Sequence, residues 1–163
     1  MNVVLEGCDG GGKSTLAEFL SRSLSLPIQQ GSGPPRRRGE IEDRLAHYLT
    51  IDGAIFDRHP AISQPIYGSV RGEPISPEFA HMVRSFYASK PAIVYCRSVD
   101  ASRHVVKPGE NPDHIRILTQ RYQDLVGRYD AWACAHATII YRIGDSAEVV
   151  ASMVAEIIAG QPA

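Results

Sequence analysis

The chain has 163 residues, of which 44% are apolar and 21% are charged, proportions typical of a globular domain that buries its own core. Its 17 basic and 18 acidic residues give a formal net charge of −1, which excludes a general attraction to nucleic acid or to an anionic membrane. Its three cysteines form no C-x-x-C pair, which argues against a disulfide framework or a zinc site.

Short apolar runs of strand length alternate along the chain with segments of helical periodicity. The expected strands are Val3–Glu6, Pro27–Gln30, Ala54–Phe56, Ala92–Cys96 and Thr138–Ile143. The expected helices are Thr15–Leu24, Glu40–Leu49, a helix capped by Ser76 and beginning at Pro77, Pro112–Ala135, and a last helix after Asp145 that buries Val149, Val150, Met153, Val154, Ile157 and Ile158. The segments expected to be irregular are Gly31–Gly39, Pro60–Pro74 and Lys107–Pro112.

This alternation predicts an α/β fold of three layers, with a five-stranded parallel sheet between helices on both faces. We expect a single domain over residues 1–163, because no linker, repeat or low-complexity tract divides the chain. Ligands should then bind at the carboxyl ends of the strands. No apolar stretch is long enough to span a bilayer and the first residues do not resemble a signal peptide, so we expect a cytoplasmic protein.

The segment after the first expected strand reads Gly-Cys-Asp-Gly-Gly-Gly-Lys-Ser and fits the phosphate-loop pattern G-x-x-x-x-G-K-[ST] between a strand and a helix. Its glycines let successive N–H groups point at phosphate oxygens beside the helix N-terminus. We expect Lys13 to reach the β- and γ-phosphates and the Ser14 hydroxyl to ligate Mg²⁺. The predicted nucleotide-binding residues are Gly7, Cys8, Asp9, Gly10, Gly11, Gly12, Lys13, Ser14 and Thr15.

Two motifs carry a resemblance to a known family. Residues 6–15 resemble the E-G-x-D-G-x-G-K-[ST]-T signature of thymidylate kinases. The run Phe56-Asp57-Arg58-His59, followed by Ser63 and Tyr67, is similar to the D-R-[YH]…S…Y segment of that family and of related deoxynucleoside kinases. The resemblance covers most of the chain and implies the P-loop kinase fold.

The resemblance implies phosphoryl transfer from ATP to a thymidine-like acceptor, with Mg²⁺. It places Asp9 toward the acceptor sugar or the attacking group, and Asp57 with Arg58 between the donor and acceptor phosphates. These roles suit a reaction that depends mostly on positioning and on stabilisation of charge. We expect Ser14 and Asp57 to be the Mg²⁺ ligands.

The chain departs from the thymidylate kinase pattern in three ways. It lacks the Arg-Glu-Pro segment after the second strand, it is shorter than usual members, and Gly11 stands where some members carry an arginine. A catalytic cation must therefore come from elsewhere, and we expect a short lid around residues 97–116. Its candidate cations are Arg97, Arg103, Lys107 and Arg116, of which we choose Arg103 as the catalytic one.

The acceptor is the open question at this stage. Short phage relatives of thymidylate kinase phosphorylate 5-hydroxymethyluracil within DNA during thymidine hypermodification, and this chain resembles them in its Asp-Arg-His-Pro run. Arg36, Arg37 and Arg38 would contact the DNA backbone, unless they form a solvated loop. We therefore favour an acceptor in DNA, which would place the protein in the host cytoplasm if phage-encoded.

Three alternatives stay open. The first is a kinase for free dTMP or another deoxynucleoside monophosphate, and the second is a regulatory P-loop ATPase without a small acceptor. The third is a function like that of adenylate or shikimate kinase, because a fold does not determine a substrate. The oligomeric state also stays open, a homodimer included.

Overall fold

The computed structural model describes residues 1–31, 33, 35, 37, 39–98 and 112–160. Its strands are β1 (Val3–Glu6), β2 (Ile28–Gln30), β3 (Ile55–Asp57), β4 (Ala92–Arg97) and β5 (Ile139–Arg142). Its helices are α1 (Lys13–Leu24), α2 (Glu40–Tyr48), α3 (Pro60–Arg71), α4 (Pro77–Ala88), α5 (Pro112–Gln120), α6 (Tyr122–His136) and α7 (Ala147–Ala159). The five strands form one parallel sheet in the order β2-β3-β1-β4-β5, which confirms the expected α/β class.

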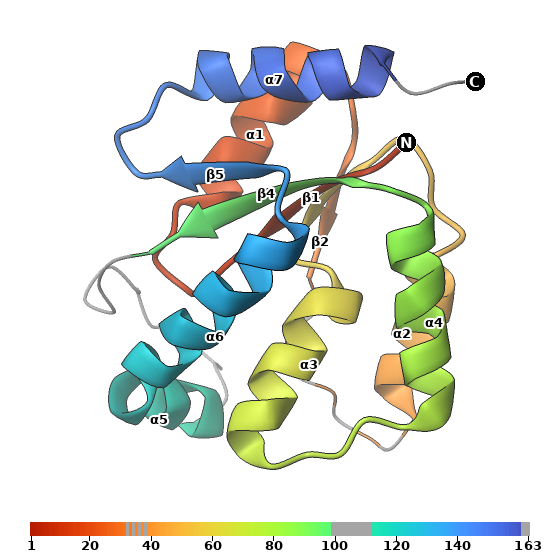
Figure 1. The fold of residues 1–163 in the computed structure, drawn as a ribbon, viewed down its shortest axis with the longest axis vertical. Coiled ribbons are helices and arrows are strands. Elements are labelled where there is room, and N and C mark those ends of the chain that lie inside the picture. The colour runs from red at the N-terminus through yellow and green to blue at the C-terminus, as the bar shows by residue number, and fades with distance from the viewer. Residues whose placement is uncertain (32, 34, 36, 38, 99–111, 161–163) are drawn as a thin grey trace.

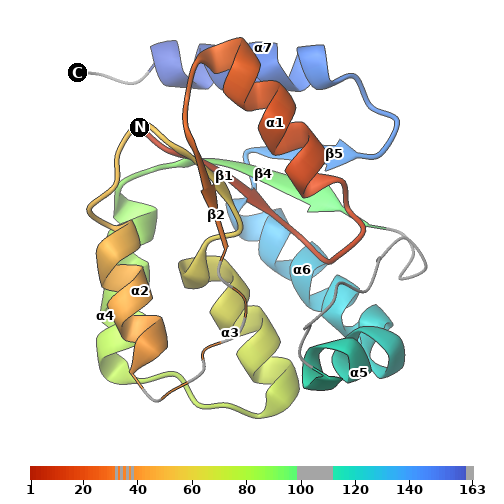
Figure 2. The same ribbon diagram turned by 180° about the vertical axis from the view of Figure 1, so that it is seen from behind.

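The sheet separates two hydrophobic cores (Figures 1 and 2). Successive strand residues point to opposite faces, so Val3 and Leu5 of β1 pack with α1 and α7 on one side. Val4 packs on the other side, with residues of α2, α3, α4 and α6. Because both faces are covered, β1 is buried along its whole length, as its unbroken apolar run predicts.

The strand order places the end of β1 at the point where the connections change direction. From β1 the chain builds β2 and β3 on one side of the sheet, and then β4 and β5 on the other. Ligands of such sheets bind in the crevice at this switch point, outside the carboxyl ends of the strands. The loop that follows β1 contains the phosphate-loop motif, so this motif lies at the switch point.

The prediction that Pro60–Pro74 is irregular was wrong, because most of this segment is α3. The proline and glycine residues here mark the ends of a helix. Pro60 is its first residue, and the imidazole of His59 caps it by accepting a hydrogen bond from the Ala61 amide at 3.2 Å. Gly72 ends the helix in the left-handed conformation with φ 74°. Pro65 lies inside the helix without ending it.

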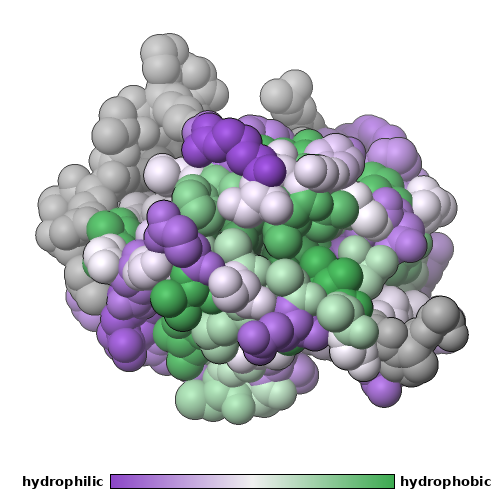
Figure 3. All heavy atoms as spheres, turned by 90° about the horizontal axis from the view of Figure 1, so that it is seen from above, coloured by the Kyte–Doolittle hydropathy of each residue, from purple (hydrophilic) through white to green (hydrophobic). Residues whose placement is uncertain are grey.

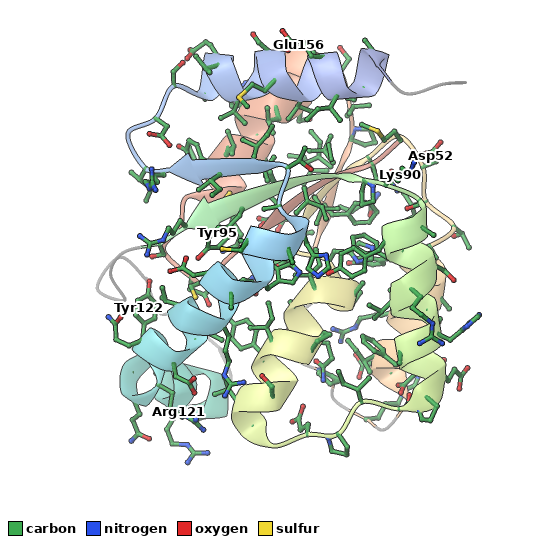
Figure 4. The ribbon with its side chains drawn as sticks, in the orientation of Figure 1. Asp52, Lys90, Tyr95, Arg121, Tyr122 and Glu156 are labelled. Carbon is green, nitrogen blue, oxygen red and sulfur yellow. The ribbon has the colours of Figure 1, made fainter. Side chains whose placement is uncertain are left out.

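The predicted long helix Pro112–Ala135 is two helices. The break falls at Arg121, whose φ of −127° and ψ of 21° leave the helical region. Figure 4 shows Arg121 and Tyr122 at the junction of α5 and α6. The Arg121 guanidinium donates to the backbone oxygen of Val70 at 2.9 Å, while Tyr122 is buried. The break therefore attaches the start of α6 to the end of α3.

The predicted cap of α4 is confirmed. The Ser76 hydroxyl accepts a hydrogen bond from the Phe79 amide at 3.1 Å, and Pro77 is the first helical residue. The same hydroxyl donates to Glu42 at 2.9 Å, which connects α4 to α2.

The outer face of α7 is more exposed than its sequence predicts. Val150 and Val154 are buried, but Val149 is 58% and Met153 is 42% exposed, so their predicted burial was wrong. Only one stripe of this helix meets the core, since α7 forms the outermost layer. Figure 3 views this side of the molecule and shows apolar residues gathered over its middle. Among the described helices, none is long and apolar enough to cross a membrane.

His59 is buried among aromatic rings, and this keeps its imidazole neutral. It is 2% exposed and stacks on Phe86 with 4.3 Å between ring centroids. Burial lowers the pKa of His59 to about 3. The imidazole of an unfolded chain titrates near about 6.5, so below that pH the unfolded state binds a proton that the folded state does not. Stability should therefore fall as the pH decreases from about 6.5 toward 3.

We predict that His59 alone lowers the free energy of unfolding by about 2 kcal/mol between pH 7 and pH 5. The substitution His59→Asn keeps a capping side chain and removes the titration. The variant should be less stable at pH 7, because the aromatic stacking is lost, yet show a smaller decline toward pH 5. Urea unfolding at the two pH values measures both effects, and equal declines in the two proteins would contradict the neutral imidazole.

Candidate active site

The phosphate loop lies directly on the end of β4. A Cβ atom on Gly7 would lie 2.2 Å from the backbone oxygen of Cys96, and one on Gly11 would lie 2.5 Å from it. Neither position has room for a side chain. The contact gives a physical reason for the glycine at position 11, where some thymidylate kinases carry an arginine. Gly12, with φ 76°, then leads into α1 at Lys13.

Lys13 folds back over the loop that carries it. Its side chain is buried and donates a hydrogen bond to the backbone oxygen of Cys8 at 2.7 Å. Burial lowers the pKa of Lys13, and the guanidinium of Arg58 lowers it further. Burial also raises the pKa of the Cys8 thiol to about 12, so this group stays protonated and fills space. The next two residues, Ser14 and Thr15, are exposed on the first turn of α1.

Ser14 and Asp57 meet although they lie 43 positions apart in the sequence. The Ser14 hydroxyl donates to Asp57 Oδ2 at 2.6 Å, at the end of β3 beside the phosphate loop. A hydroxyl and a carboxylate oxygen are ligands that Mg²⁺ takes when phosphates and waters complete its shell. Among the described residues, no group of three or more His, Cys, Asp or Glu side chains could hold a metal. The donor chemistry of the Ser14–Asp57 pair is compatible with the predicted Mg²⁺ site.

Asp9 and Arg58 form an ion pair between the phosphate loop and the end of β3. Arg58 Nη2 lies 2.9 Å from Asp9 Oδ1, without the direction of a hydrogen bond. The Tyr67 hydroxyl donates to the other carboxylate oxygen of Asp9 at 3.0 Å. The guanidinium carbon of Arg58 lies 5.5 Å from the centroid of the Tyr67 ring. The structure thus brings together three residues from the two motifs.

The backbone of Arg58 is held in an unusual conformation. Its φ of 75° is in the left-handed region, which costs a non-glycine residue about 1–2 kcal/mol. Its amide donates to the backbone oxygen of Leu5 at 3.0 Å. A Cβ atom on Gly31 would lie 3.1 Å from the Arg58 Cβ, so the loop after β2 leaves room for this turn because it has a glycine there.

Arg97 is already bound to α6. Its Nε and Nη2 atoms donate to the carboxylate of Asp130 at 2.9 and 2.8 Å, and the Tyr95 hydroxyl donates to the same carboxylate at 2.7 Å. Figure 4 shows Tyr95 between β4 and α6. These bonds hold the pKa of Asp130 below its usual range. The pair anchors the end of β4 to a helix.

Of the other predicted cations, only Arg116 and Arg37 belong to the described residues, and both lie on the surface. Arg103 and Lys107 lie outside the described residues, as does most of the expected lid at 97–116, and Arg116 is exposed on α5. Of the basic cluster, Arg36 and Arg38 also lie outside them. Arg37 forms a surface ion pair with Asp43 at 2.7 Å.

Three features of the site are not indicated by any sequence motif: the burial of the Glu6 carboxylate, Tyr129 and Gly31. Tyr129 of α6 donates to Glu6 at 3.0 Å and accepts from Arg58 Nη1 at 3.4 Å. It belongs to an apolar stripe whose spacing indicates only a core position. Gly31 falls in a loop whose other glycines, Gly33 and Gly39, have open space around them, so only the fold reveals which glycine is needed.

Neither a protein-family model nor a curated protein matches the chain. Among solved structures, it is similar to the YorR protein of Bacillus subtilis in complex with phosphorylated GDP, with a TM-score of 0.69 and 20% identity over 98% of this chain and 96% of that one. It is also similar to the deoxyadenosine kinase of M. mycoides with products dCMP and a flexible dCDP, with a TM-score of 0.56 and 14% identity over 98% of each chain. The chain therefore has the fold of P-loop kinases.

We predict that Gly11→Ala weakens ATP binding by about tenfold or more, because the loop must move away from Cys96. The matched control is Gly127→Ala in α6, where a Cβ atom would meet nothing within 4 Å. The control should keep its affinity and gain up to about 1 kcal/mol of stability from better helix propensity. Calorimetric titration with ATP measures the affinities. Unchanged affinity in Gly11→Ala would contradict the close packing of loop and strand.

Proposed function

We propose that this chain is an ATP-dependent phosphotransferase whose acceptor is a hydroxyl group of a thymidine-like pyrimidine deoxynucleotide, with 5-hydroxymethyl-deoxyuridine in DNA as the leading candidate. The observation that carries the proposal is the Asp9 carboxylate, which lies within the phosphate loop and is held by Arg58 and Tyr67. We further propose that the whole chain acts as one kinase domain, with a lid around residues 97–116 that supplies Arg103.

The donor half of the site consists of the phosphate loop and the pair at the end of β3. Backbone N–H groups of the loop and the ammonium of Lys13 would bind the phosphates of ATP, with Lys13 leaving the Cys8 carbonyl to do so. Ser14 and Asp57 would hold Mg²⁺. Mg²⁺ bound there supplies positive charge that neutralises the β- and γ-phosphate oxygens.

The acceptor half favours a hydroxyl nucleophile. A hydroxyl must lose a proton during transfer, and a carboxylate within hydrogen-bond reach can accept it. Asp9 offers such a carboxylate at the phosphate loop. When an acceptor hydroxyl takes the place of Tyr67 on Asp9, the Arg58 guanidinium beside it can stabilise the charge of the transferring phosphate.

An anionic acceptor is less suited to these charges. A monophosphate needs arginine clamps, but Arg58 and Arg97 are each paired with a carboxylate of the chain itself. A phosphate acceptor would have to compete with those carboxylates. The charge pairing therefore supports a hydroxyl acceptor over a free nucleoside monophosphate.

The two similar structures support a nucleotide ligand, since both contain one. The thymidine-like base and the DNA context rest on the motif resemblance and on the Arg36–Arg38 cluster. The described residue of this cluster, Arg37, pairs with Asp43, and each of the two side chains is 65% exposed. Such a pair contributes at most about 1 kcal/mol, so a DNA phosphate can replace Asp43.

An acceptor panel tests the proposal. The protein is incubated with γ-labelled ATP and Mg²⁺ and offered, in parallel, dTMP, thymidine, plain DNA and DNA containing 5-hydroxymethyluracil. We expect label only in the modified DNA. Label in dTMP alone would contradict the hydroxyl acceptor, and hydrolysis of ATP without transfer to any acceptor would indicate the regulatory ATPase. Lys13→Ala should abolish transfer in every case.

We predict that Asp57→Asn raises the Mg²⁺ concentration needed for half-maximal activity by about tenfold, because it removes an anionic ligand. The matched control is Asp52→Asn, which lies before β3 at the opposite end of the sheet and pairs with the N-terminal ammonium at 2.7 Å (Figure 4). A Mg²⁺ titration of the transfer rate measures both variants. An unchanged requirement in Asp57→Asn would remove Asp57 from the metal site.

A further inference from the structure

Glu6, the last residue of β1, is a fully buried carboxylate with a complete set of hydrogen-bond donors. It is 0% exposed. Its Oε1 accepts from the His59 amide at 2.7 Å, and its Oε2 accepts from the Gly7 amide at 3.2 Å and from the Tyr129 hydroxyl at 3.0 Å. The three donors come from the turn after β3, from the phosphate loop and from α6.

Two of these bonds reach Arg58, one at its backbone and one at its guanidinium. The His59 amide belongs to the peptide that follows Arg58, so its bond to Glu6 restrains the left-handed backbone there. The Tyr129 hydroxyl donates to Glu6 and accepts from Arg58 Nη1. The Glu6 carboxylate therefore restrains the Arg58 guanidinium through this hydroxyl. In a buried network such bonds reinforce one another.

The burial of Glu6 separates it from the reacting groups. A general base must come within hydrogen-bond reach of the acceptor hydroxyl. Both Glu6 oxygens are instead occupied by donors of the chain, with no exposed surface. Any effect of Glu6 on transfer must therefore pass through the groups that it holds.

We propose that Glu6 is a positioning residue for phosphoryl transfer, which holds Arg58 at Asp9 through the His59 amide and the Tyr129 hydroxyl. This inference rests on the proposed role of the Asp9–Arg58 pair. Arg58 stabilises the charge of the transferring phosphate, while ATP binds to the loop amides and Lys13. Loss of Glu6 should therefore lower kcat and leave the KM for ATP nearly unchanged.

The test compares Glu6→Gln, Tyr129→Phe and the double variant, with Tyr87→Phe as the matched control. Glu6→Gln should lower kcat by about a hundredfold and Tyr129→Phe by about tenfold, each with a KM for ATP within about twofold of the wild type. The double variant should be no slower than Glu6→Gln, since both changes act on one chain of bonds. Tyr87→Phe removes another tyrosine hydroxyl that bonds to α6, the one that accepts from Trp132 Nε1 at 2.8 Å, and it should keep its kcat.

Three kinetic outcomes would overturn the inference. The first is a wild-type kcat in Glu6→Gln or in Tyr129→Phe. The second is an equal loss in Tyr87→Phe, which would show a general loss of packing. The third is the loss of the acidic limb of the kcat–pH profile in Glu6→Gln but not in Tyr129→Phe, which would make Glu6 the general base.

A second readout separates this inference from the proposed function. If the wild type transfers phosphate to no acceptor, the proposed function fails, and crystal structures of the same variants then test the positioning. Arg58 should leave its left-handed φ, or its guanidinium should shift by about 1 Å or more, in Glu6→Gln and not in Tyr87→Phe. An unmoved Arg58 would contradict the inference.

Discussion

The carboxyl edge of the sheet is organised around one partly buried cation, the guanidinium of Arg58. It lies between the Asp9 carboxylate and the Tyr129 hydroxyl, over the ring of Tyr67, and it follows directly on β3. Burial disfavours a charge, but Asp9 and neighbouring groups outweigh that effect and raise the pKa of Arg58 well above its usual value. The phosphate loop, α3 and α6 are thus connected through a single charged group.

The second constraint is the close approach of the phosphate loop to β4. Because Gly7 and Gly11 rest against the Cys96 carbonyl, the loop is fixed to the sheet at its switch point. This placement also sets the positions of Lys13 and Ser14, which begin α1, and brings Ser14 to Asp57 at the end of β3. The fold alone does not determine a substrate, and the two similar structures contain different nucleotides. The local charge pairing is what supports a hydroxyl acceptor.

Local signals in the sequence predicted the strands and the phosphate loop, because an apolar run or a glycine spacing needs no distant partner. The end signals of α3 were misread as breaks, and the periodicity across Arg121 did not reveal the break between α5 and α6. Glu6 and Tyr129 could not be paired, since their contact joins residues 123 positions apart. The predicted role of Arg103 stays a prediction, because it lies outside the described residues.

The central claim is that a hydroxyl group, not a phosphate, receives the γ-phosphate. The most direct test offers both nucleophiles in one molecule, a DNA oligonucleotide that begins with 5-hydroxymethyl-deoxyuridine and carries a 5′-phosphate. After reaction with ATP and Mg²⁺, ³¹P NMR distinguishes the two products by phosphorus–phosphorus coupling. The account predicts an uncoupled phosphate ester on the hydroxymethyl oxygen. A coupled phosphoanhydride at the 5′-phosphate would contradict it.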